Sequence, residues 1–114
     1  HVEAIYRQEY WNKINGDKLP SGLDWSVFDW AVNSGPGRSA RALQRIVGVK
    51  ADGGIGPMTM AAVNKYDAAT LIDDMYYRRQ SFYERLKTFE TFGNGWTRRN
   101  DETREQAHQL AQLS

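Results

Sequence analysis

The spacing of apolar side chains constrains the fold of this chain more than any other feature of its sequence. Apolar residues recur every three or four positions in several segments, and a glycine or proline interrupts most of these segments after a few turns. No useful stretch alternates apolar and polar residues as a half-buried strand does. The sequence therefore predicts an all-α fold, a compact bundle of five or six helices with short connections.

The expected helices are delimited by residues that favour helix ends. We expect Gly35 to end the second helix in the left-handed conformation and Gly48 to end the third. Ser21 with Asp24 is the expected cap before the second helix. The segment "KTFETFGNGW" is expected to be a connector. The predicted helices span residues 2–11, 23–34, 38–47, 58–66, 68–86 and 96–113.

Composition sets further limits on the class of protein. The chain has 114 residues, of which 40% are hydrophobic and 25% charged, as in one small globular domain. Its formal net charge of +1 argues against nucleic acid or an anionic membrane as a partner. There is no Cys, and His1 and His108 match no metal-ligand spacing, so no metal or cofactor is expected.

No apolar run is long enough to span a bilayer, and no signal peptide is visible. The chain opens without Met and already in a helical pattern, which is typical of a fragment or a processed product. An apolar face left exposed by such truncation would favour a homodimer or a helix swap.

The stretch "FDWAVNSGPGR" carries the candidate polar site. Asp29 lies in the most apolar helix, and a buried carboxylate needs a partner, which a backbone group or an arginine could supply. Asn33 follows one turn later, on the same side. It could hydrogen-bond a sugar at the Ser34–Gly35 corner, or it could cap its own helix. Both interpretations stay open at the level of sequence.

Aromatic residues and the glycine-rich segment add weaker signals. Tyr10 and Trp30 could stack on sugar rings, although burial in the core is the competing interpretation. "DGGIGPMT" lacks the Lys-Ser/Thr ending of a phosphate loop and the ligand spacing of a calcium loop. Asp52 in this segment is expected to bond local backbone N–H groups. "SGPGRSARALQRIVG" could form a helix-turn-helix, but the chain lacks a basic recognition face.

Four motifs together resemble a known family. "IYRQEYW", "FDWAVNSGPGRSARALQRIVGV", "DGGIGPMTMAAV" and "FGNGWTRR" have the order and spacing of glycoside hydrolase family 108. These are lysozyme-like N-acetylmuramidases of phages and proteobacteria, once described as secretion activators. The resemblance covers nearly the whole chain. It implies one helical domain, 1–114, in which residues 1–37 end the lysozyme-like catalytic part and residues 38–114 form the peptidoglycan-binding part.

The sequence departs from the family at one place that matters for catalysis. The family's catalytic Glu lies in a Glu-Gly-Gly motif before "IYRQEYW", and this sequence contains no such motif. The resemblance therefore implies the C-terminal part of a muramidase, inactive alone, with no catalytic residue assigned. The alternative is a non-catalytic peptidoglycan-binding module of a secretion or cell-wall protein.

The resemblance also implies a ligand and a place of action. We expect the chain to bind the glycan strands of peptidoglycan. It would act on the cell wall, either in the periplasm or outside the cell, or after release of a phage-encoded protein at lysis. The expected substrate-binding residues are Tyr10, Asp29, Trp30, Asn33, Ser34 and Gly35.

Overall fold

The computed structural model describes residues 2–113, and the side chains of residues 7–113. Every regular element in that range is helical, which confirms the all-α prediction. The Cα radius of gyration is 13.5 Å, close to the value of about 13 Å expected for one compact domain of this length. The elements are α1 (Val2–Lys13), the short 3₁₀ helix η1 (Gly16–Lys18), α2 (Leu23–Ser34), α3 (Pro36–Val47), α4 (Pro57–Val63), α5 (Ala68–Glu84) and α6 (Phe89–Gln112).

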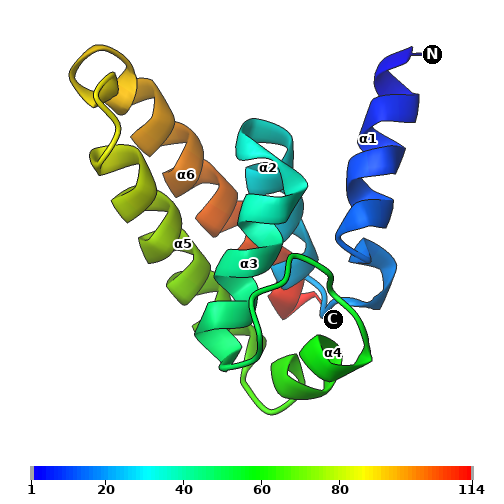
Figure 1. The fold of residues 1–114 in the computed structure, drawn as a ribbon. Coiled ribbons are helices and arrows are strands. Elements are labelled where there is room, and N and C mark those ends of the chain that lie inside the picture. Colours follow the sequence, from blue (N-terminus) through cyan, green and yellow to red (C-terminus); the bar gives the residue numbers. More distant parts are fainter. Residues whose placement is uncertain (1, 114) are drawn as a thin grey trace.

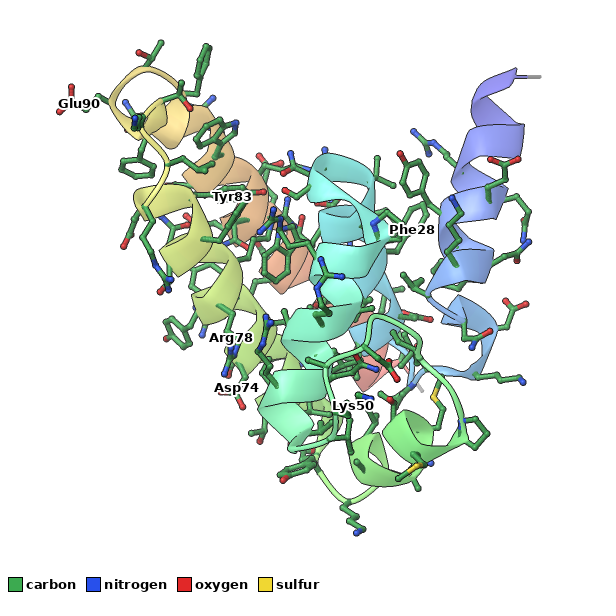
Figure 2. All side chains as sticks on the ribbon, in the orientation of Figure 1. Phe28, Lys50, Asp74, Arg78, Tyr83 and Glu90 are labelled. Carbon is green, nitrogen blue, oxygen red and sulfur yellow. The ribbon has the colours of Figure 1, made fainter. Side chains whose placement is uncertain are left out.

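Helix α2 lies at the centre of the bundle, as its wide apolar arc predicts (Figure 1). It packs against α3, α5 and α6, and α5 and α6 form a long hairpin on one side of it. Helix α1 lies on the other side, where the Trp11 ring meets the Phe28 ring edge-on at 5.4 Å. Phe28 points from α2 toward α1 (Figure 2). The most apolar helix of the sequence thus joins the outer helices into one core.

The α2–α3 corner differs in one detail from the prediction. Gly35 ends α2, but its φ of 102° and ψ of 142° are not left-handed helical values. This backbone conformation strongly favours glycine, and it lets α3 begin at once with Pro36. Gly48, with φ of 81° and ψ of 27°, is left-handed and ends α3 as predicted.

The predicted cap of α2 is wrong by one residue. Gly22 occupies the cap position, and Asp24 Oδ1 accepts hydrogen bonds from the backbone N–H groups of Gly22 and Trp25. Ser21 turns away, and its hydroxyl donates to the carbonyl of Leu110 on α6. A tertiary partner therefore takes the hydroxyl that the local sequence pattern assigned to the helix end.

The largest difference concerns the segment "KTFETFGNGW", which is mostly helix and not a connector. Helix α6 begins at Phe89 and passes through Gly93 and Gly95. Gly93 is buried, and a Cβ there would lie 2.7 Å from the ring of Phe89, one turn earlier. Glycine makes room for that ring, so here it serves packing and does not break the helix.

Candidate functional site

A buried polar network connects α2, α5 and α6. Asp29 is only 4% exposed, and its Oδ2 lies 2.9 Å from Nη1 of Arg79, which is 2% exposed. The second arginine, Arg99, reaches the same carboxylate with Nε at 3.2 Å from Oδ2 and with Nη2 on Oδ1. The Thr103 hydroxyl donates to Oδ2 at 2.9 Å. The buried Asp29 is thus held by two arginines, the partner type that the sequence analysis allowed.

The network continues from Asp29 to the surface through α5. Arg79 Nε donates to the Tyr83 hydroxyl at 2.8 Å, and that hydroxyl donates to Asn33 Oδ1 at 2.7 Å. Asn33 Oδ1 also accepts from the Ser34 hydroxyl at 2.7 Å. Tyr83 lies between α5 and α2 (Figure 2). Asp29 and Asn33 therefore do share one side of α2, and Arg79 and Tyr83 join them.

The electrostatics of the network keep Asp29 ionised. Burial by itself would raise the pKa of Asp29. The hydrogen bond from Arg99, the charge of Arg79 and the Thr103 hydroxyl outweigh burial and hold this pKa below its ordinary value. Burial raises the pKa of Tyr83, so its hydroxyl stays protonated as a donor to Asn33. The site is therefore a fixed ion-pair network with a neutral amide at its exposed end.

The predicted site residues fall into two groups by exposure. Asn33 is exposed, and Ser34 and Gly35 are partly exposed beside it at the α2–α3 corner. Asp29 and Trp30 are buried, at 4% and 3% exposure. Burial agrees with the core interpretation of Trp30, because too little of this side chain is exposed for stacking on a sugar. Tyr10 is half-buried on α1 and packs against the core. The predicted contacts of these residues with glycan stay predictions.

A stripe on α6 supplies site residues that the sequence analysis did not identify. Phe92, Trp96 and Arg99 follow one another at helical spacing on the side of α6 that carries Thr103. The Trp96 ring stacks on Tyr83 with centroids 5.3 Å apart, and Phe92 lies 5.7 Å from Trp96. Phe92 is 53% exposed. The Tyr83 hydroxyl donates to Asn33 Oδ1. The aromatic stripe on α6 therefore lies next to the amide of Asn33 at the α2–α3 corner.

We call the exposed part of this region the corner surface; it consists of Asn33, Ser34, Phe92, Trp96 and Arg99. The signal that could have found the α6 members was the spacing of "FGNGWTRR". The predicted connector separated Phe92 from Trp96 and Arg99, which lie in the predicted helix 96–113. The Arg79 and Tyr83 stripe on α5 was visible in the sequence, but its partners were not.

The glycine-rich segment has the structural role that the sequence predicts for Asp52. Asp52 Oδ1 accepts from the backbone N–H of Gly54 at 2.9 Å. Gln44 on α3 is 1% exposed and donates to Asp52, to the Gly54 carbonyl and to Thr59, while its Oε1 accepts from Gly53 N–H. The buried amide therefore fixes the loop between α3 and α4.

No three His, Asp or Glu side chains in the part of the chain that the structure describes come together in a way that could hold a metal ion. Within residues 2–113, no helix combines the length and apolarity needed to cross a bilayer.

The helical architecture and this site define a lysozyme-like helical domain with a polar and aromatic corner. Residues 38–101 match the family model described as Predicted Peptidoglycan domain, and residues 1–35 match the model for Glycosyl hydrolase 108. The first match covers more than half of the chain, so the chain belongs to the predicted peptidoglycan domain family. The resemblance to glycoside hydrolase family 108 with its peptidoglycan-binding region is confirmed.

A solved structure supports the same assignment. The structure of SagA from Brucella abortus superposes on this chain with a TM-score of 0.93 and 44% sequence identity. The alignment covers 96% of this chain and 63% of SagA, so this chain spans less than two thirds of SagA. No curated protein sequence matches the chain.

Proposed function

We propose that this chain binds the glycan strands of peptidoglycan through the corner surface, as the C-terminal part of a peptidoglycan-degrading muramidase. The observation that carries this proposal is the exposed amide of Asn33, which the Tyr83 hydroxyl holds at 2.7 Å. The matched peptidoglycan family gives the class of ligand. The match to Glycosyl hydrolase 108 in residues 1–35 supports a muramidase as the whole protein.

The chemistry of the corner surface suits an N-acetylated sugar. The Asn33 Nδ2 group can donate to a hydroxyl or acetamido oxygen, while the Arg99 side chain is 58% exposed beside the network. Phe92 and Trp96 offer apolar ring surface for the carbon face of a sugar. The buried ion pairs fix these groups before binding, which lowers the entropic cost of ordering them.

The same network argues that Asp29 binds or positions and does not donate the catalytic proton. A general acid in glycoside hydrolysis needs a raised pKa beside the leaving oxygen. Asp29 has a lowered pKa and is buried, paired with the buried Arg79 and with the more exposed Arg99. We therefore propose that the proton donor of the muramidase lies outside the residues described here.

Sedimentation with purified, insoluble peptidoglycan sacculi tests the glycan-binding proposal. The chain is expected to sediment with the sacculi, and Asn33→Ala is expected to weaken binding about tenfold. Asn64→Ala is the matched control, since Asn64 is an exposed amide at the end of α4, far from the corner (Figure 1). Equal binding by the two variants would overturn the role of the corner surface.

The parent activity needs a second comparison. A form extended upstream of residue 1 is expected to clear a turbid suspension of sacculi, while the 114-residue chain binds without clearing it. Binding without lysis by both forms would favour the non-catalytic module.

We further propose action in the periplasm, outside the cell or at phage-induced lysis. A homodimer or helix swap is also proposed, and sedimentation velocity showing only monomer at high concentration would count against it.

A further inference from the structure

A second groove lies between α3 and α5, away from the corner amide. It has a volume of about 500 Å³. Arg38, Ala42 and Arg45 contribute from one face of α3, and Arg78, Phe82 and Arg85 line the opposite wall from α5 at helical spacing. The buried Trp30 of α2 forms part of the floor.

The groove is strongly basic although the chain as a whole is nearly neutral. Arg38, Arg45, Arg78 and Arg85 are all exposed side chains, and no carboxylate is among the groove-lining residues of the described part. None of the four has an ion-pair partner within 4.0 Å among the described side chains. By contrast, the sequence carries a net charge of only +1. Four like charges around one groove repel one another, and an anionic ligand would relieve that repulsion.

Three other arginines of the fold, by contrast, are paired with carboxylates. Arg79 and Arg99 share Asp29, and Arg104 contacts Asp73 at 2.9 Å. Asp74 lies one turn before Arg78 on α5, yet it lines no part of the groove and forms no ion pair with Arg78 within 4.0 Å. Figure 2 shows Arg78 on the side of α5 nearest α3.

The arrangement of the charges indicates the shape of the ligand. Helices α3 and α5 run in opposite directions (Figure 1), and the Arg38 guanidinium lies 4.2 Å from the Phe82 ring centroid. Arg38 and Arg85 therefore mark one end of the groove, and Arg45 and Arg78 the other. Arginines seven residues apart on a helix are separated by about 10 Å along its axis. Three residues of an extended peptide span a similar length, about 10 Å.

From these observations we infer that the α3–α5 groove binds the carboxylates of a peptidoglycan stem peptide. An extended peptide with carboxylates near both ends would meet a guanidinium at each end and apolar side chains of the groove between them. Guanidinium groups bind carboxylates in a bidentate manner. Stem peptides combine such carboxylates with small apolar alanine side chains, and a groove of this size holds a few residues. The inference rests on the proposed function, because it assigns the peptide of the same polymer to a second site.

Titration with soluble probes, followed by NMR, tests this inference on the whole chain. The probe is the free-acid peptide L-Ala-γ-D-Glu-meso-diaminopimelate-D-Ala, and its carboxyl-amidated form is the first comparison. The free acid is expected to bind and to shift the Arg38, Arg45, Arg78 and Arg85 side-chain signals. Equal binding of the amidated peptide would overturn the inference, because charge would not be what the groove recognises.

Variants locate the binding in the groove. Arg45→Gln combined with Arg85→Gln is expected to weaken the peptide about tenfold or more. Arg98→Gln, an exposed arginine of α6 outside the groove, is expected to leave affinity within about twofold. A melting temperature equal to that of the parent chain shows that the double variant is folded. Equal loss of affinity in both variants would overturn the assignment to the groove.

Further probes separate this inference from the proposed function and from other anions. Chitotetraose reports on the glycan site alone, because it carries no stem peptide, and the double variant is expected to bind chitotetraose as the parent chain does. Binding of sacculi and chitotetraose without binding of the free peptide would overturn the groove inference alone. Failure to bind chitotetraose, with peptide binding intact, would overturn the glycan proposal alone. Inorganic phosphate or a short oligonucleotide that binds as tightly as the peptide would overturn the choice of ligand.

Discussion

Replacing Asp29 with Asn would remove the charge that holds α2, α5 and α6 together. The substitution keeps the size of the side chain but leaves Arg79, which is 2% exposed, without its carboxylate. Arginine cannot lose its proton in a protein, so the buried cation would stay uncompensated. Removing one member of a buried ion pair costs about 3–5 kcal/mol. The Arg99 contribution is small, because its side chain is 58% exposed and a solvated pair is worth about 1 kcal/mol or less.

This loss can be measured directly. A chain of this size unfolds with an entropy that corresponds to about 4 °C per kcal/mol, so the melting temperature should fall by about 12–20 °C. Urea unfolding followed by tryptophan fluorescence at pH 7 gives the free energy of unfolding of parent and variant. Asp74→Asn is the matched control, because Asp74 is exposed on α5, and its effect should stay within about 0.5 kcal/mol.

A double-mutant cycle with Arg79→Met isolates the pair. If the buried charges carry the effect, the double variant should lose less stability than the sum of the two single variants. The reasoning would be refuted if Asp29→Asn cost no more than Asp74→Asn. Strict additivity of Asp29→Asn and Arg79→Met would refute it as well.

Three further predictions concern other parts of the structure. Because the pKa of Asp29 is lowered on folding, its contribution is present above the unfolded pKa of about 3.9 and is lost as pH falls through the folded pKa. Unfolding free energies measured from pH 7 to pH 2 should therefore converge for the parent chain and Asp29→Asn at the acid end. Gly95→Ala should stabilise α6 by about 0.5–1 kcal/mol, since nothing lies within 4 Å of its added Cβ. Gly93→Ala should give no such gain, because the added Cβ would meet the Phe89 ring at 2.7 Å, and equal melting temperatures for the two variants would contradict this. Gln44→Leu should lower the free energy of unfolding by about 1–3 kcal/mol. It should also speed hydrogen exchange of the Gly53 N–H, which donates a hydrogen bond to Gln44 Oε1 in the parent chain, and an unchanged exchange rate would contradict the role assigned to Gln44.

The sequence by itself determined the helical class, the central place of α2 and most helix ends. These features depend on local physics: the helical spacing of Leu23, Val27 and Ala31, and the glycines that end α2 and α3. The sequence also placed Asp29 and Asn33 on one side of α2, because residues four apart on a helix share a face. The four motifs also indicated the family, because a motif is defined by the order and spacing of its residues alone.

Tertiary structure alone decided which groups these residues meet. The carboxylate of Asp29 lies 70 positions before its partner Arg99 and 74 before Thr103, and no local pattern indicates such pairs. Packing of α6 against α5, with the Trp96 ring on Tyr83, also accompanies helix through most of "KTFETFGNGW". In the sequence, the four groove arginines are typical of solvent-exposed helix faces. Only the antiparallel packing of α3 on α5 brings them around one groove, because their separation depends on long-range contacts and not on residue order.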